Sequence, residues 1–271
     1  MLRQRLITAF LLFLLTLVLI FRAPFWIFAV FLMLVAFLGG REWGRLSLIV
    51  WPDGLGLVLA ALIPSVFMLP QHFPWASMAL GSVIWWLLLA IGLVLMSPSL
   101  LRDAPAWQRP LSAITAFPVL LPALLFSVSL QRYAPQFLLW VILVISAGDV
   151  GAMASGKTWG RHQLVPRISP GKTWEGLMGG LLASAIMGTL GAWIWVGAAT
   201  PTLFSGAFLG LITGAFAVLG DLSESFLKRR ADCKDSGQLL PGHGGLLDRL
   251  DSMSAGIPVF VAGLYYLDWW K

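Results

Sequence analysis

The sequence contains very few residues of the kinds that staple small secreted domains or bind soft metals. Of its 271 residues one is cysteine and three are histidine, so an intramolecular disulfide is excluded and a zinc site of the Cys/His type is disfavoured. Charged residues are also scarce, at 11%, whereas 59% of the residues are hydrophobic and include 14 Trp and 17 Phe. A soluble domain has about 25% charged residues. The composition therefore indicates a membrane protein.

Apolar runs recur along the chain at the length that crosses a bilayer, about 20 residues. We expect an all-α, polytopic membrane helix bundle of about nine transmembrane helices. We group residues 1–135 as N-terminal membrane helices and residues 136–271 as C-terminal membrane helices that carry the polar signature described below, within one integral membrane unit. Pro24 separates the first two spans, and one long kinked helix is the alternative there. The expected spans are residues 6–21, 24–40, 54–70, 76–96, 111–130, 137–154, 174–197, 203–224 and 253–270.

The basic residues are distributed unevenly between the two sides of this predicted bundle. With the N-terminus inside, all of the 18 lysines and arginines lie inside except Arg22, Arg132 and Lys271. Positive charge gathers on the cytoplasmic side of membrane proteins, so the long polar segments 155–173 and 225–252 should face the cytoplasm. The net charge of +6 then suits anionic lipid headgroups and nucleotide phosphates rather than nucleic acid.

Residues 221–252 form a dense polar and charged stretch in this otherwise apolar chain. Asp221, Ser225 and Lys228 stand at i, i+4 and i+7, which places them on one face of a helix. Asp248 and Asp251 stand three apart and share a helical face in the same way. Charged groups held against apolar surroundings are costly and mark functional sites by default. The stretch therefore locates the chemistry of the protein.

This stretch resembles the signature of the phosphatidate cytidylyltransferases (CDP-diacylglycerol synthases), S-x-x-K-R-x4-K-D-x-G-x2-L-P-x-H-G-G-x-x-D-R-x-D. The fixed positions are matched by Ser225, Lys228, Arg229, Lys234, Asp235, Gly237, Leu240, Pro241, His243, Gly244, Gly245, Asp248, Arg249 and Asp251. A second matching block covers residues 169–176, and a third begins at Asp149. In the third block Met153 stands where the family has an aromatic residue.

The resemblance implies an enzyme of the bacterial cytoplasmic (inner) membrane whose active site faces the cytoplasm. It would transfer a cytidylyl group from CTP to phosphatidate, and it would use Mg²⁺ held by Asp221 and Asp248, with a second cation left open. Membrane lipids and a second copy of the chain in a homodimer are the other partners that the resemblance suggests. The implied catalytic residues are Asp248, Lys228, Ser225, Asp221 and Asp251, and the implied substrate-binding residues are Lys172, Thr173, Ser169, His243, Gly244, Gly245, Arg249, Lys234 and Asp149.

The block at residues 169–176 predicts the start of a helix that can bind phosphate. Ser169 to Gly171 should form a turn, Thr173 should cap the helix, and Lys172 should project beside the exposed backbone N–H groups. Residues 151–158 also satisfy the P-loop pattern G-x-x-x-x-G-K-[ST]. We reject that interpretation because the preceding residues form a membrane span and not a buried β-strand; we expect a polar helix end followed by a glycine and basic loop.

Two other classes of function fit part of the sequence. A related CTP-using membrane lipid nucleotidyltransferase or lipid kinase would have a similar composition and charge. A multispan transporter would also place polar residues in an apolar bundle, but usually near the bilayer midplane. Here the polar residues concentrate at one side, which favours the enzyme.

Overall fold

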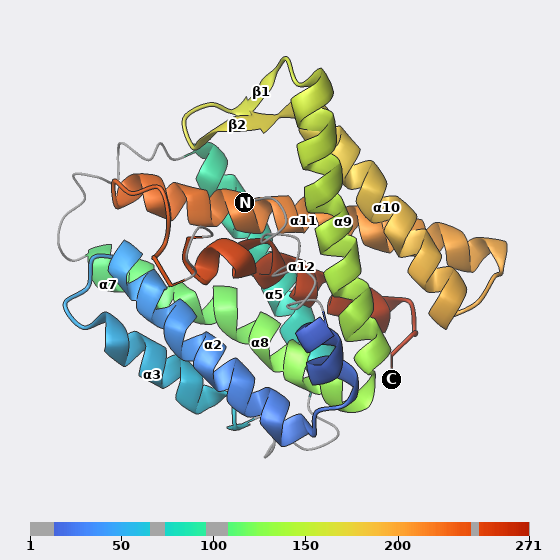
Figure 1. Cartoon of the computed structure of the whole chain (residues 1–271), viewed down its shortest axis with the longest axis horizontal. Coiled ribbons are helices and arrows are strands. Elements are labelled where there is room, and N and C mark those ends of the chain that lie inside the picture. The colour runs from blue at the N-terminus through green and yellow to red at the C-terminus, as the bar shows by residue number, and fades with distance from the viewer. Residues whose placement is uncertain (1–13, 66–73, 96–107, 240–243, 271) are drawn as a thin grey trace.

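The computed structural model describes residues 14–65, 74–95, 108–239 and 244–270. Within these ranges the chain is almost entirely helical, with one small β-hairpin at an edge of the bundle (Figure 1). The elements are α2 (Phe25–Leu46), α3 (Pro52–Leu62), α5 (Trp75–Leu95), α7 (Gln108–Ile114), α8 (Ala116–Tyr133), α9 (Pro135–Trp159), β1 (Gln163–Val165), β2 (Ser169–Thr173), α10 (Trp174–Trp195), α11 (Thr200–Arg230) and α12 (Leu247–Tyr266).

The prediction of an all-α polytopic membrane bundle is confirmed, although the count of nine spans holds only approximately. Six stretches of helix within the described residues are long and apolar enough to cross a membrane, namely 25–46, 75–93, 109–133, 135–159, 174–195 and 200–230. The span expected at 54–70 is represented by α3, which has only 11 residues. The first expected span, 6–21, lies partly outside the described residues.

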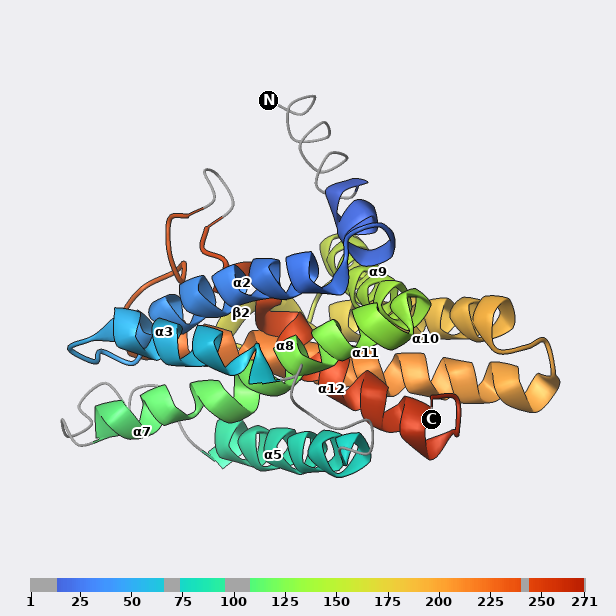
Figure 2. The same cartoon turned by 90° about the horizontal axis from the view of Figure 1, so that it is seen from below.

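Helix α12 lies at the centre of the bundle, between α8 and α5 on one side and α11 on the other (Figures 1 and 2). Every residue from Ser254 to Val261 on this helix is buried. Its first turn is different in character, because it carries Asp248. The helix therefore brings a polar end and an apolar body into the middle of the molecule.

Helices α9, α10 and α11 approach one another closely because small residues line their contacts. A Cβ atom at Gly180 of α10 would lie 2.9 Å from the carbonyl oxygen of Gly148 on α9, and one at Gly188 would lie 2.8 Å from Cα of Gly210 on α11. Small residues are the usual means by which membrane helices pack closely. This packing fixes the three helices that surround the polar residues of the C-terminal half.

The segment from Asp149 to Trp159 is helical, which corrects the expectation of a glycine and basic loop after Asp149. Helix α9 continues through the whole P-loop-like sequence. The hydroxyls of Ser155 and Thr158 donate to the carbonyls of Gly151 and Ala154 at 2.7 and 2.8 Å, so these polar side chains are satisfied on the helix itself. Because no strand and no phosphate-binding turn precede this helix, the rejection of the P-loop is confirmed.

Ser169 to Gly171 belong to strand β2, which corrects the expectation of a turn. Strand β2 pairs antiparallel with β1, with Gln163 opposite Thr173 and Val165 opposite Ser169. A residue that precedes proline favours extended backbone, and this favours a strand at Ser169. The prediction for Thr173 is confirmed, because its Oγ1 accepts a hydrogen bond from the backbone N–H of Gly176 at 3.0 Å and so caps α10.

Candidate active site

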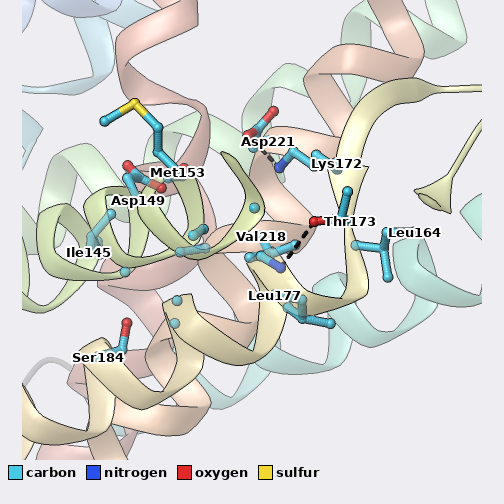
Figure 3. Close-up of a pocket in the computed structure, with 18 of the residues that line it drawn as sticks. Ile145, Asp149, Met153, Leu164, Lys172, Thr173, Leu177, Ser184, Val218 and Asp221 are labelled. Atoms are coloured by element: carbon cyan, nitrogen blue, oxygen red, sulfur yellow. Dashed lines mark hydrogen bonds and ion pairs between the residues drawn. The ribbon is translucent and has the colours of Figure 1, made fainter. Parts of the chain in front are cut away.

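A polar cavity of about 410 Å³ lies between α9, α10, α11 and the first turns of α12 (Figure 3). Its walls include Asp149 from α9, Asp221 from α11, Asp248 and Asp251 from α12, and Lys172 and Thr173 from β2. Six of the residues predicted for the site thus come together from four separate elements. Lys157, which the sequence analysis set aside with the P-loop, also lines this cavity.

Lys172 joins the hairpin to α11 across the cavity. Its Nζ atom forms an ion pair of 2.5 Å with Oδ2 of Asp221, and both side chains are partly exposed; Figure 3 shows Lys172 pointing toward Asp221 from the strand. The hydroxyl of Ser225 donates to Oδ1 of the same carboxylate at 3.3 Å. The predicted common face of Asp221 and Ser225 is therefore present, with a lysine from another element facing it.

Lys228 joins α11 to α12 in a more buried environment. Its Nζ atom donates to Oδ1 of Asp248 at 2.6 Å and to Oε2 of Glu224 at 3.1 Å, and the side chains of Lys228 and Asp248 are only 12% and 11% exposed. Removing one partner of such a buried pair leaves an uncompensated charge, which is strongly destabilising. The three groups therefore form one unit that ties the two helices together.

The glycine-rich end of the signature folds around Asp248. Gly244 has φ = +83°, a conformation that favours glycine, and it directs the backbone N–H of Gly245 to Oδ2 of Asp248 at 2.7 Å. The backbone N–H and the hydroxyl of Ser236 both lie 3.1 Å from the same oxygen. In this arrangement the backbone N–H of Gly245 donates its hydrogen bond to the carboxylate of Asp248.

These contacts decide the charge of Asp248. Burial by itself would raise the pKa of its carboxyl, but the hydrogen bonds from Lys228, Gly245 and Ser236 together hold that pKa below its usual value. Asp248 is therefore ionised at neutral pH. The carboxylate accepts from Gly245 and Ser236 at one oxygen and from Lys228 at the other, so it is held in a fixed position.

Glu42 of α2 is part of this site, and the sequence analysis missed it. Its side chain accepts hydrogen bonds from the backbone N–H of Leu246 at 3.1 Å and of Leu247 at 2.8 Å, and from the hydroxyl of Ser236 at 2.9 Å. Glu42 is only 5% exposed. It places a negative charge at the N-terminus of α12, where the backbone N–H groups favour one. The sequence feature that could have indicated Glu42 is its position as a lone carboxylate at the end of an apolar run.

Among the described residues, the other residues predicted for the site do not line the polar cavity. Ser169 is half-buried on β2, Lys234 is exposed after α11, and Arg249 lines a different, apolar cavity. His243 lies outside the described residues. In the part of the chain that is described, no group of three Asp, Glu, His or Cys side chains stands close enough to hold a metal ion.

The fold and this cavity define a class of protein. It is an integral membrane protein whose bundle holds a cluster of carboxylates and lysines at one end, an arrangement that can bind anionic groups together with a cation.

Comparison with known proteins agrees with this class and identifies the family. Residues 3–267 match the Cytidylyltransferase family, and the chain belongs to it. It is 37% identical over 275 residues to the phosphatidate cytidylyltransferase of Pseudomonas aeruginosa, with 99% of each chain covered. It is 33% identical to the phosphatidate cytidylyltransferase of Haemophilus influenzae, over 96% of this chain and 97% of that one. The enzyme of the same name from Staphylococcus aureus is 31% identical, over 85% and 86%.

Replacing Glu42 by glutamine should destabilise the protein. The amide NH₂ cannot accept a hydrogen bond, so one of the donors around Glu42 is left unsatisfied in a buried place, at a cost of about 1–3 kcal/mol. The measurement is thermal unfolding of the purified protein in detergent. Glu175→Gln is the matched control, since Glu175 also accepts two backbone N–H groups, from Arg161 and His162, but at the surface. Equal midpoints for the two variants would contradict the role assigned to Glu42.

Proposed function

We propose that the protein transfers a cytidylyl group from CTP to phosphatidate and releases pyrophosphate, which yields CDP-diacylglycerol for phospholipid synthesis. The observation that carries this proposal is the polar cavity in an otherwise apolar bundle. Lys172 on its wall is paired with Asp221, and Lys228 behind the wall is paired with the lining residue Asp248. The names of the three relatives point to the same reaction.

The chemistry matches the residues that the cavity provides. An oxygen of the phosphatidate phosphate attacks the α-phosphorus of CTP, a new P–O bond forms, and the bond to the β-phosphate breaks with the electron pair leaving on pyrophosphate. The attacking oxygen is already ionised near neutral pH, so no strong base is needed. The difficulty is to bring two anions together and to stabilise the charge that develops. Lysines held in fixed positions meet both needs.

Within this scheme Lys172 and Lys228 neutralise the phosphates of the two substrates. Each lysine is oriented by a carboxylate, Lys172 by Asp221 and Lys228 by Asp248. Ser225 stands four residues after Asp221 on α11 and donates a hydrogen bond to its carboxylate. It therefore helps to hold Asp221 toward Lys172. Fixed donors of this kind need no reorganisation when the reaction occurs.

The carboxylates of the cavity supply oxygen ligands for a divalent cation, although no three of them among the described residues stand close enough together to hold one in this arrangement. Asp149, Asp221, Asp248 and Asp251 line the walls, and of the lysines only Lys157 and Lys172 do so. A cavity with this excess of negative charge would repel two phosphate substrates unless a cation joined them. Oxygen donors suit Mg²⁺, and Asp221 and Asp248 would hold it with Asp149 and Asp251 on the same walls. Bound there, Mg²⁺ would supply charge neutralisation at the transferring phosphoryl group.

The orientation in the membrane is the second part of the proposal. CTP is present in the cytoplasm, and the distribution of lysine and arginine favours the same side for the signature segments. We therefore infer a cytoplasmic membrane protein whose polar cavity opens toward the cytoplasm and whose lipid substrate stays in the bilayer. A transporter is less well supported because the charged groups gather at one end of the bundle.

Labelled CTP tests the reaction. Purified protein incubated with phosphatidate and CTP should transfer label to the lipid from the α-phosphate and not from the γ-phosphate. Label from the γ-phosphate would identify a lipid kinase, and label from neither would favour a transporter.

Asp248→Asn, which keeps the side-chain volume but loses the charge, should lower kcat by more than about tenfold, equivalent to about 1.4 kcal/mol. Smaller losses in a folded variant would remove Asp248 from the principal catalytic groups.

Cys233 tests the orientation, because it is the only cysteine in the chain. It follows α11 and is half-buried, and burial raises the pKa of its thiol against the opposing effect of Lys228. We expect slow labelling by a membrane-impermeant maleimide, seen only after spheroplasts are opened. Cys233→Ser combined with Tyr133→Cys is the control, since Tyr133 is the exposed last residue of α8, on the side predicted to be outside. Labelling of Cys233 in intact spheroplasts would place the signature outside and contradict the proposed function.

A further inference from the structure

A second cavity, of about 350 Å³, lies on the other side of α12 from the polar one. Its walls come from the helical residues 14–21, from α2 and α8, from the first half of α9 and from α12. Almost all of the lining side chains are apolar. The hydroxyls of Ser127 and Ser254 are turned back onto carbonyls of their own helices, at 2.7 and 2.6 Å. Arg249 is the one charged residue among the described residues that line it.

Helix α12 separates the two cavities and presents a different face to each. Asp248, Asp251 and Ser252 line the polar cavity. Residues 246, 249, 250, 253, 254 and 257, spaced by three or four, line the apolar one. This is the spacing of a single helical face. The neighbouring residues Asp248 and Arg249 therefore place a carboxylate in one cavity and a guanidinium in the other.

Helix α9 links the two cavities along one continuous face. Leu138 and Ile142 line the apolar cavity, and Ile145, Asp149 and Ala152 line the polar one. The steps between these residues are four, three, four and three, so they form one stripe on the helix. At the junction Ile145 lies against α12, since a Cβ atom at Gly256 would be 2.7 Å from its Cδ1. Ile145 therefore stands on this stripe between the residues that line the apolar cavity and Asp149.

We propose that this apolar cavity binds an acyl chain of the phosphatidate substrate, with Arg249 attracting the lipid phosphate at its mouth. The inference rests on the proposed function, because it assigns a place to the tail of the lipid that the reaction consumes. A phosphate that reacts beside Asp248 and Lys228 cannot leave its acyl chains in a cavity lined by carboxylates. This apolar cavity shares both α9 and α12 with the polar cavity.

The size, the lining and the charge of the cavity fit that occupant. Ligand cavities of about 300–1,000 Å³ with mostly apolar walls and a few polar groups are typical binding sites. The cation at the mouth complements a phosphate headgroup. A third cavity, at the far end of α12 near Phe204 and Tyr266, has no charged residue among its described lining and lies away from Asp248. It is therefore a poorer fit for an acidic lipid.

Val35→Phe tests the site because Val35 lines the apolar cavity and is only 6% exposed. Val30→Phe is the matched control, since Val30 lies on the same helix and is 59% exposed. The substrates are dioleoyl phosphatidate and dibutyryl phosphatidate, whose chains are too short to need the cavity. We expect Val35→Phe to lower kcat/KM by about tenfold or more for dioleoyl phosphatidate, and to leave turnover of dibutyryl phosphatidate and the KM for CTP within about twofold.

Equal behaviour of Val35→Phe and Val30→Phe on the long-chain lipid would overturn the inference. Turnover of the dibutyryl lipid reports that the variant is folded. If Val35→Phe loses both activities, Ser127→Leu fills the same cavity from α8 and decides by the same criterion.

A phosphatidate with a photoreactive diazirine on its acyl chain gives a readout that needs no turnover. In the absence of CTP it should label α2 and α8 in the wild-type protein, and Val35→Phe should reduce that label. Labelling elsewhere would overturn the site even in an active enzyme, whereas a wild-type protein inactive on both lipids would overturn the proposed function instead.

Discussion

The contact on which the active end of this molecule depends is the ion pair between Lys228 and Asp248, with 2.6 Å between Nζ and Oδ1. Both charges are largely buried, so each needs the other to offset its loss of hydration. The pair fixes the last turns of α11 against the first turn of α12. Since Asp248 also gathers the N–H groups of Ser236 and Gly245, the same interaction folds the intervening loop. This arrangement holds Asp248 on the wall of the polar cavity.

Glu42 extends the network into the N-terminal half of the chain. The hydroxyl of Ser236 lies within hydrogen-bond distance of both Glu42 and Asp248, so two carboxylates from opposite ends of the sequence meet at one side chain. Helix α2 therefore also positions residues of the C-terminal signature. It orients the N-terminus of α12, and its other residues form a wall of the apolar cavity. Helix α12 thus borders both cavities, and α2 borders the apolar one.

The local features of this fold could be predicted from the sequence, and the contacts between distant residues could not. Apolar runs and the cap at Thr173 act within a few residues of one another, and they gave the spans, the start of α10 and the shared face of Asp221 and Ser225. The β-hairpin was missed because residues 169–171 have the Ser-Pro-Gly composition of a turn, whereas pairing with β1 makes them a strand. The helical course of residues 149–159 was missed because close packing against α10 outweighs the glycines at 151 and 156. Glu42 contacts residues about two hundred positions away, and no local pattern reports such a pairing.

Helix α12 separates a polar cavity from an apolar one, which is what an enzyme needs if it joins a water-soluble nucleotide to a lipid. The face of α12 that carries Asp248 and Asp251 borders the polar cavity, where we propose that the nucleotide binds. The face that carries Arg249 and Met253 borders the apolar cavity, where we propose that the lipid chain binds. The most direct test of this account is a structure of the protein with Mg²⁺ and a CTP analogue whose α–β bridging oxygen is replaced by a methylene group. The account predicts that the triphosphate lies in the polar cavity with its oxygens in contact with Lys172 and Lys228, and a nucleotide bound outside the space between α9, α10, α11 and α12 would contradict it.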